Sequence, residues 1–225
     1  DLGLIACPGA EELCKLVDSH LVRWAREVGN TDVDTFIIPS DCPRFQSGDA
    51  KGLVKASTRG DDLYIFVDPG NYSVTYQLFG YENHLSPDDH FQNLMRLIQA
   101  VAGRAHRISV IMPSLYGGRQ HRRVSRESLD CAFALQQLRD VGVKNIITFD
   151  AHDPRVMNAV PTMSFDNVMP TYQVLKCLLH HVPDVSFHKD NFMIVSPDEG
   201  AMNRNMYYSS VLGCNLGMFY KRRDY

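Results

Sequence analysis

Arg107-Ile-Ser-Val-Ile-Met-Pro113 is the stretch that decides the fold. This short run of β-branched and apolar side chains, stopped by a proline, predicts a buried β-strand. The runs Leu63-Tyr-Ile-Phe-Val-Asp68 and Asn145-Ile-Ile-Thr-Phe-Asp150 have the same character. Segments with helical spacing of apolar residues lie between them, so we expect parallel strands joined by helical crossovers, which is an α/β fold.

Helix signals stand on both sides of these strands. Apolar residues recur at helical spacing over 13–28, and Gly29 stands where that helix would stop. Ser86-Pro-Asp-Asp89 combines a capping serine, a proline at the first helical position and acids that suit the helix dipole. Further strands are expected at 35–39, 192–195 and 217–220, and further helices at 129–142, 171–181 and 202–211.

Length and composition are those of a globular protein. The 225 residues are 44% hydrophobic and 22% charged, with a formal net charge of -3. A disordered or collagen-like chain would have a different composition. No apolar run approaches the roughly 20 residues of a membrane span. The chain also lacks the excess of basic residues that non-specific binding of nucleic acid requires. We therefore expect a soluble cytoplasmic protein with reduced cysteines. The loop at 158–170 is the expected boundary between two subdomains.

Charged residues collect in the loops that follow the expected strands. The basic runs at 119–123 and 221–223 suit a polyphosphate, because guanidinium groups bind phosphate oxygens bidentately and lysine adds a mobile charge. Asp150, His152 and Asp198 suit a divalent cation that bridges such phosphates. Each run alone fits a solvated surface loop equally well. Their shared position at the carboxyl ends of parallel strands is what favours a site.

The usual phosphate-binding motifs are missing from the sequence. It contains neither a G-x-x-x-x-G-K-[ST] loop nor a G-x-G-x-x-G element after a strand. A P-loop ATPase and a simple dinucleotide-binding domain are therefore disfavoured. The spacing of these residues predicts an α/β protein that binds a magnesium–phosphate ligand. It does not identify that ligand or a reaction.

Five segments at these loops resemble the phosphoribosyl pyrophosphate synthetases, also called ribose-phosphate pyrophosphokinases. They occur in the family's order and at about its spacing, at 44–49, 113–123, 147–152, 195–200 and 221–223. The resemblance implies two tandem phosphoribosyltransferase-like (Rossmann-like) parallel-sheet domains. The first, on the ATP side, would span 1–168, and the second would be incomplete and span 169–225.

The resemblance also implies an activity and its residues. The family transfers the pyrophosphoryl group of ATP to ribose 5-phosphate with Mg²⁺, giving phosphoribosyl pyrophosphate and AMP, and works as a homo-oligomer (dimer or hexamer). His152 and Asp198 would lie with Mg²⁺, and Lys221 and Arg223 match the basic pair of the catalytic loop. The implied ATP contacts are Phe45, Ser47, Asp49, Arg119 and Gln120. The apolar residues Tyr72, Tyr76, Leu78 and Phe79 suit either an oligomer interface or the core.

Three departures from the family pattern shape the expectation. His121 stands where many members have an acid, and Ser47 leaves the 45–49 segment one acid short. The acidic and glycine-rich element that cradles the 5-phosphate of ribose is absent. We therefore expect a C-terminally truncated synthetase that binds nucleotide at best on its own. The alternatives are a non-catalytic regulatory or interaction subunit, and an ordinary phosphoribosyltransferase, which fits the fold but not the ATP-side residues.

Overall fold

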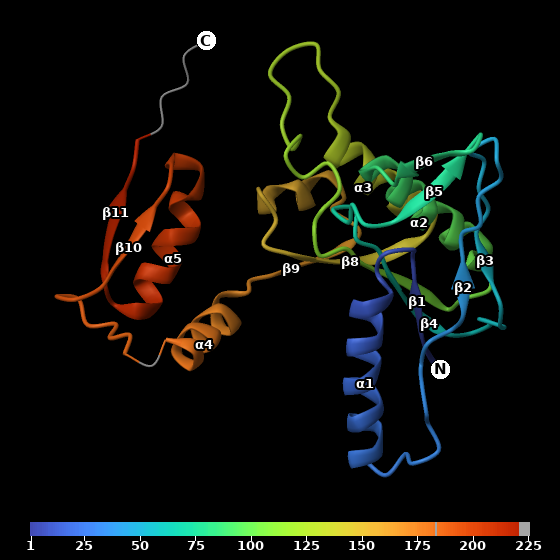
Figure 1. Cartoon of the computed structure of the whole chain (residues 1–225), viewed down its shortest axis with the longest axis horizontal. Coiled ribbons are helices and arrows are strands. Elements are labelled where there is room, and N and C mark those ends of the chain that lie inside the picture. The colour runs from blue at the N-terminus through green and yellow to red at the C-terminus, as the bar shows by residue number, and fades with distance from the viewer. Residues whose placement is uncertain (183, 221–225) are drawn as a thin grey trace. The chain divides into compact units, whose positions relative to one another are not determined.

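A computed structural model describes residues 1–182 and 184–220 of the chain (Figure 1). The contacts within the chain fall into two compact units, Asp1–Val168 and Met169–Tyr225. Each unit contains a parallel sheet, so the expected α/β class is confirmed.

The first unit is built on a five-stranded sheet with the order β1-β4-β7-β8-β9. Every neighbouring pair in it is parallel. The strands are β1 (Leu2–Ala6), β4 (Asp62–Phe66), β7 (Arg107–Ile111), β8 (Val143–Phe149) and β9 (Ser164–Val168). The three runs that decided the fold from the sequence are thus β4, β7 and β8, and they are adjacent.

Helices cover both faces of this sheet. On one face, Ile5, Ile65, Val110 and Ile146 stand in register across four strands and are all fully buried. They belong to the core cluster that includes residues of α2 (Pro87–Val101) and α3 (Asp130–Asp140). On the other face, residues of β1 and β4 pack against α1 (Glu11–Glu27). Burial on both faces explains why these strands read as continuous apolar runs.

The strand expected at 35–39 is reduced to one parallel bridge, between Ile37 and Leu4 of β1. The buried Asp18 of α1 holds the segment there, since its carboxylate accepts hydrogen bonds from Thr35 Oγ1 and Phe36 N. The 35–39 segment, which follows α1, thus lies along one side of β1, and β4 lies along the other side of β1. The direction of winding changes between β1 and β4, which is the usual place for a ligand crevice in such sheets.

The loop expected at 158–170 contains a strand instead. β9 pairs along β8 over its whole length, from Ser164 opposite Asn145 to Val168 opposite Phe149. It follows the short 3-10 helix η1 (Pro154–Ala159), whose residue Val156 belongs to the main core. Polar Asp166 and Asn167 break the apolar pattern of this edge strand, which explains why it reads as a loop.

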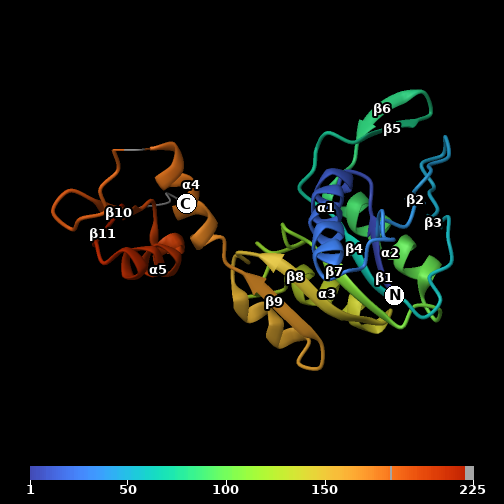
Figure 2. The same ribbon diagram turned by 90° about the horizontal axis from the view of Figure 1, so that it is seen from below.

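A hairpin of β5 (Thr75–Leu78) and β6 (Tyr81–His84) projects from the first unit (Figure 2). Phe79 and Gly80 form its tight turn, both with positive φ, of 48° and 86°. Tyr72 and Phe79 are 71% and 72% exposed, so neither is a core residue. Elsewhere in this unit, β2 (Ser40–Asp41) and β3 (Leu53–Val54) form a short antiparallel pair.

The second unit contains the expected elements at closely matching positions. They are α4 (Thr171–His181), β10 (Met193–Ser196), the 3-10 helix η2 (Glu199–Ala201), α5 (Met202–Leu212) and β11 (Asn215–Met218). The strands β10 and β11 are parallel, and α5 packs on both. Gly213 ends α5 in the left-handed conformation, with φ of 64°.

The six cysteines are all free thiols, and five of them are buried. Among the described residues, no helix combines the length and the apolar character needed to cross a bilayer.

Ser86 caps α2 as the sequence predicts. Its hydroxyl accepts from the Asp89 amide at 3.2 Å, and the Asp89 carboxylate accepts from the Ser86 amide at 2.9 Å. Replacing a capping serine by alanine typically costs about 1 kcal/mol. We predict this loss of unfolding free energy for Ser86→Ala, measured by urea denaturation. Ser57→Ala, in an exposed loop, is the control and should change stability little. An unaltered midpoint for Ser86→Ala would contradict the capping role.

The same cap predicts a pH dependence through Asp89. Burial alone would raise the pKa of this carboxyl, but hydrogen bonds from Ser86 and Arg44 outweigh it and lower the pKa from 3.8. A depressed carboxyl pKa stabilises the fold above the unfolded pKa, and this contribution is lost as pH falls through the folded pKa. The difference in unfolding free energy between Asp89→Asn and the parent should therefore be largest near neutral pH and should decrease at acid pH. A difference independent of pH in urea titrations would refute this.

Candidate functional site

Two neighbouring strands bring the main candidate loops together. β7 and β8 are parallel neighbours, so the loops after Ile111 and Phe149 leave the same edge of the sheet. Phe149 N donates to Pro113 O at 3.2 Å, which ties the two loops at their roots. Arg119, Gln120 and His152 are placed at this edge, as the sequence predicts from the carboxyl ends of parallel strands.

The turn after β8 has a fixed direction. Asp150 adopts the left-handed conformation, with φ of 47°, and its amide donates to Val168 O at 3.0 Å. The Ala151 amide donates to Asn167 Oδ1 at 2.9 Å. A non-glycine residue in this conformation needs support from its surroundings, and β9 supplies it here. The strand that the sequence analysis missed therefore positions His152 and Asp153.

A compact polar cluster joins the two loops. The His121 and His152 rings lie 5.0 Å apart between centroids and are tilted by 33°. His121 Nε2 lies 3.6 Å from Asp153 Oδ2. Arg155 binds the same carboxylate through Nη2 at 2.6 Å and Nε at 2.9 Å. These hydrogen bonds from Arg155 hold the pKa of Asp153 well below its usual range, with a smaller contribution from the charge of His121.

Gln120 is engaged with its own loop. Its side-chain oxygen accepts from the Asp130 amide at the start of α3, and its side-chain nitrogen donates to Ser128 O. The amide group therefore closes the 120–130 loop onto α3. Arg119, Arg122 and Arg123 beside it are exposed and form no salt bridge within the described part of the chain. Their guanidinium groups are therefore exposed cations at this edge.

The turn that carries Phe45, Ser47 and Asp49 is held rigidly by its neighbour Arg44. Arg44 donates to Gly48 O at 3.1 Å, pairs with Asp89 at 2.9 Å and lies 4.2 Å above the Tyr76 ring. Ser47 Oγ donates to Asp49 Oδ2 at 2.8 Å. The Phe45 ring is 55% exposed, so it is presented to solvent.

The remaining predicted residues belong to the second unit. Asp198 caps η2, since its Oδ1 accepts from the Ala201 amide at 3.0 Å, and Ser196 Oγ donates to its carbonyl at 2.8 Å. Lys221 and Arg223 lie outside the described residues.

The structure thus sorts the predicted residues into groups. Arg119, Gln120 and His152 share one edge of the sheet, and the turn of Phe45, Ser47 and Asp49 lies against the hairpin, where Phe79 N donates to Gln46 O. Among the described residues, no side-chain hydrogen bond or salt bridge joins these two groups. Sequence reasoning gave no role to Asp153 and Arg155, although the Asp-Pro pair at 153–154 is a readable helix-cap signal.

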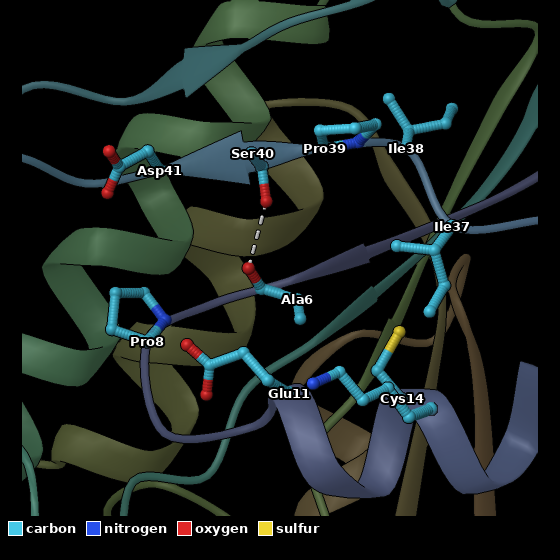
Figure 3. A pocket seen from close by; sticks show the side chains of 10 residues that line it. Ala6, Pro8, Glu11, Cys14, Ile37, Ile38, Pro39, Ser40 and Asp41 are labelled. Carbon is cyan, nitrogen blue, oxygen red and sulfur yellow. Dashed lines mark hydrogen bonds between the residues drawn. The ribbon is translucent and has the colours of Figure 1, made fainter.

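The cavity in Figure 3 lies elsewhere, beside the end of β1. It measures about 170 Å³ and is lined by Glu11 and Cys14 of α1 and by the 37–41 segment. Burial raises the pKa of Cys14 to about 12, so this thiol stays protonated and is a poor nucleophile. None of the predicted ligand-binding residues lines the cavity.

The donor set for a metal ion is sparse. Within 1–182 and 184–220, no group of three or more His, Cys, Asp or Glu side chains is placed to hold an ion by itself. His152 is exposed and Asp198 is partly exposed, each in its own unit. Such residues fit an ion that arrives with its own phosphate and water ligands, as Mg²⁺ commonly does.

Comparisons with known proteins agree on one family. The family described as the N-terminal domain of ribose phosphate pyrophosphokinase matches residues 2–142. Ribose-phosphate pyrophosphokinase A of Dictyostelium discoideum is 24% identical over 182 residues, which cover 80% of this chain and 51% of the relative. Ribose-phosphate pyrophosphokinase 1 of Candida albicans is 24% identical over 211 residues, with 93% and 60% covered.

A solved structure has the same fold. The phosphoribosylpyrophosphate synthetase from Mycobacterium smegmatis matches with a TM-score of 0.76 and 20% identity, over 100% of this chain and 65% of that one. The chain spans about half the length of the Dictyostelium relative that it matches.

We predict that Gln120→Ala loosens the 120–130 loop. Its side chain makes three hydrogen bonds to the loop backbone, with Arg122 O, Ser128 O and the Asp130 amide. Each contributes roughly 0.5–1.5 kcal/mol. Amide exchange of Asp130, read by NMR, should therefore accelerate by about tenfold or more. Gln99→Ala, at an exposed position of α2, is the matched control and should leave this amide unchanged. Equal exchange in both variants would show that the Gln120 contacts carry no structural weight.

Proposed function

The chain belongs to the ribose phosphate pyrophosphokinase family, and from this premise we propose that it takes part in the synthesis of phosphoribosyl pyrophosphate. In this reaction the anomeric oxygen of ribose 5-phosphate attacks the β-phosphorus of ATP. The bond from the β-phosphorus to the oxygen bridging it to the α-phosphorus breaks, AMP leaves, and the hydroxyl proton is released. The family match over residues 2–142 is the observation that carries this proposal.

The exposed arginines at the edge of β7 and β8 support a polyphosphate site. Arg119, Arg122 and Arg123 have no carboxylate partner within the described residues, so their guanidinium groups are available to phosphate oxygens. A guanidinium binds two such oxygens at once. We propose that Arg119 binds ATP here. Gln120 would support the site mainly by shaping the loop, because its side chain is occupied.

The turn at 44–50 supports a role at the nucleoside end of ATP. An exposed, rigidly mounted aromatic ring such as Phe45 offers a stacking surface for a base. Ser47 and Asp49 supply a hydroxyl and a carboxylate that suit the amino and hydroxyl groups of a nucleoside. We therefore propose all three as ATP contacts.

We propose Mg²⁺ as the cofactor, and we propose His152 and Asp198, each within its own unit, as residues that bind it. The ion would neutralise phosphate charge when bound. Lys221 and Arg223 are proposed as catalytic residues that stabilise the charge on the transferring group. A cytoplasmic location and a homo-oligomer are further proposals, the latter supported by the exposed aromatic rings of Tyr72 and Phe79.

Formation of AMP and phosphoribosyl pyrophosphate from ATP and ribose 5-phosphate tests this function. We predict that Lys221→Ala lowers kcat at least ~100-fold in the full-length protein while ATP binding changes little, because the charge acts mainly in the transition state. Lys144→Ala, an exposed lysine at the amino end of β8, is the control and should keep full activity.

Two outcomes would count against the assignment. Equal turnover in Lys221→Ala and the parent would remove Lys221 from the catalytic residues. A full-length protein that binds ATP but forms no product would favour the non-catalytic subunit instead.

A further inference from the structure

The cluster of His121, His152, Asp153 and Arg155 has a feature that ATP binding by arginines does not explain. His121 Nδ1 is buried and has no hydrogen-bond partner among the described residues. The His121 side chain is 14% exposed, and that of Asp153 is 13% exposed. A buried polar atom without a partner costs free energy. Such an atom is explained when a ligand completes its bonding.

The carboxylate of Asp153 lies beside Nε2 of His121. This carboxylate is fixed by Arg155 from the next turn, through both side-chain nitrogens and the backbone amide at 3.0 Å. An ionised carboxylate 3.6 Å from Nε2 favours a proton on that nitrogen. The lone pair of the neutral ring is then on Nδ1. A carboxylate beside one imidazole nitrogen, with the other nitrogen left as a metal donor, is typical of histidines that bind metal ions.

The spacing of the two rings fits a shared ion. Two imidazoles bound at about 2.1 Å to one metal in neighbouring positions have centroids roughly 4.5–5.3 Å apart. The centroids of His121 and His152 are 5.0 Å apart. His152 is exposed. Its ring can therefore turn to admit an ion, because exposed side chains change rotamer within nanoseconds.

We propose that His121 and His152 together form a two-imidazole site for a divalent transition-metal ion such as Co²⁺ or Zn²⁺, with Asp153 and Arg155 as positioning residues. Water and phosphate oxygens would complete the coordination, since the described residues offer no third protein ligand. The assignment of His152 rests on the proposed function, whereas that of His121 rests on the geometry alone.

The proposal implies a metal preference. Imidazole nitrogen suits first-row transition metals, whereas Mg²⁺ prefers oxygen ligands and gives up its water reluctantly. A second imidazole therefore raises the affinity for Co²⁺ far more than the affinity for Mg²⁺. His121 would then determine which ion His152 binds, a transition metal in place of the Mg²⁺ assigned to it above.

Titration of the purified protein with Co²⁺ alone, followed by visible absorbance, tests the site. We expect binding that roughly a hundredfold excess of Mg²⁺ does not reverse. His121→Gln should weaken Co²⁺ binding at least ~10-fold, and Asp153→Asn should weaken it about 10-fold by releasing His121. His106→Gln is the matched control, since His106 is exposed just before β7 at the opposite end of the strands, and should bind as the parent does.

A second measurement on the parent protein avoids dependence on variants that fold poorly. In ¹⁵N NMR of the histidine rings, diamagnetic Zn²⁺ should shift the Nδ1 resonance of His121 and a nitrogen resonance of His152. Unshifted Nδ1, absent Co²⁺ binding, or equal Co²⁺ affinity in His121→Gln and the parent would overturn the proposal. These readouts need neither ATP nor product formation, so their failure is distinct from failure of the proposed function.

Discussion

The in-register row of Ile5, Ile65, Val110 and Ile146 is the constraint on which the first unit depends. A shift of one residue in any of these strands would turn its buried side chains to the other face, so the register is strongly specified. Fixed register in parallel strands also fixes where each strand ends. The loops after β7 and β8 therefore leave the sheet side by side, and the chemistry of the site follows from the packing of the core.

Strong local signals made much of the fold predictable. The apolar runs of β4, β7 and β8 and the cap of α2 at Ser86 are encoded in a few adjacent residues. The elements that were missed or overestimated depend on distant partners. β9 forms by pairing with the exposed side of β8. The 35–39 segment makes only one bridge because Asp18 accepts hydrogen bonds from its first two residues.

The candidate site was predictable in its residue types more than in its contacts. Arg119 and His152 could be chosen because they follow strands. Gln120 contacts the start of α3, and His121 lies against Asp153. Neither pair is adjacent in sequence, so no local motif predicts these contacts. Only the three-dimensional structure shows how the 119–123 run is divided. Gln120 shapes the loop, His121 lies beside His152, and the three arginines are exposed.

The central claim is that the carboxyl edge of β7 and β8 binds the nucleotide. Titration of the ¹⁵N-labelled protein with Mg²⁺ and the β,γ-imido analogue of ATP, followed by amide NMR, tests it most directly. Saturable shifts should concentrate in residues 117–123 and 150–155 and leave Lys144 and His106 at the opposite edge unmoved. Shifts confined to the cavity beside β1, or none at saturating analogue, would contradict it.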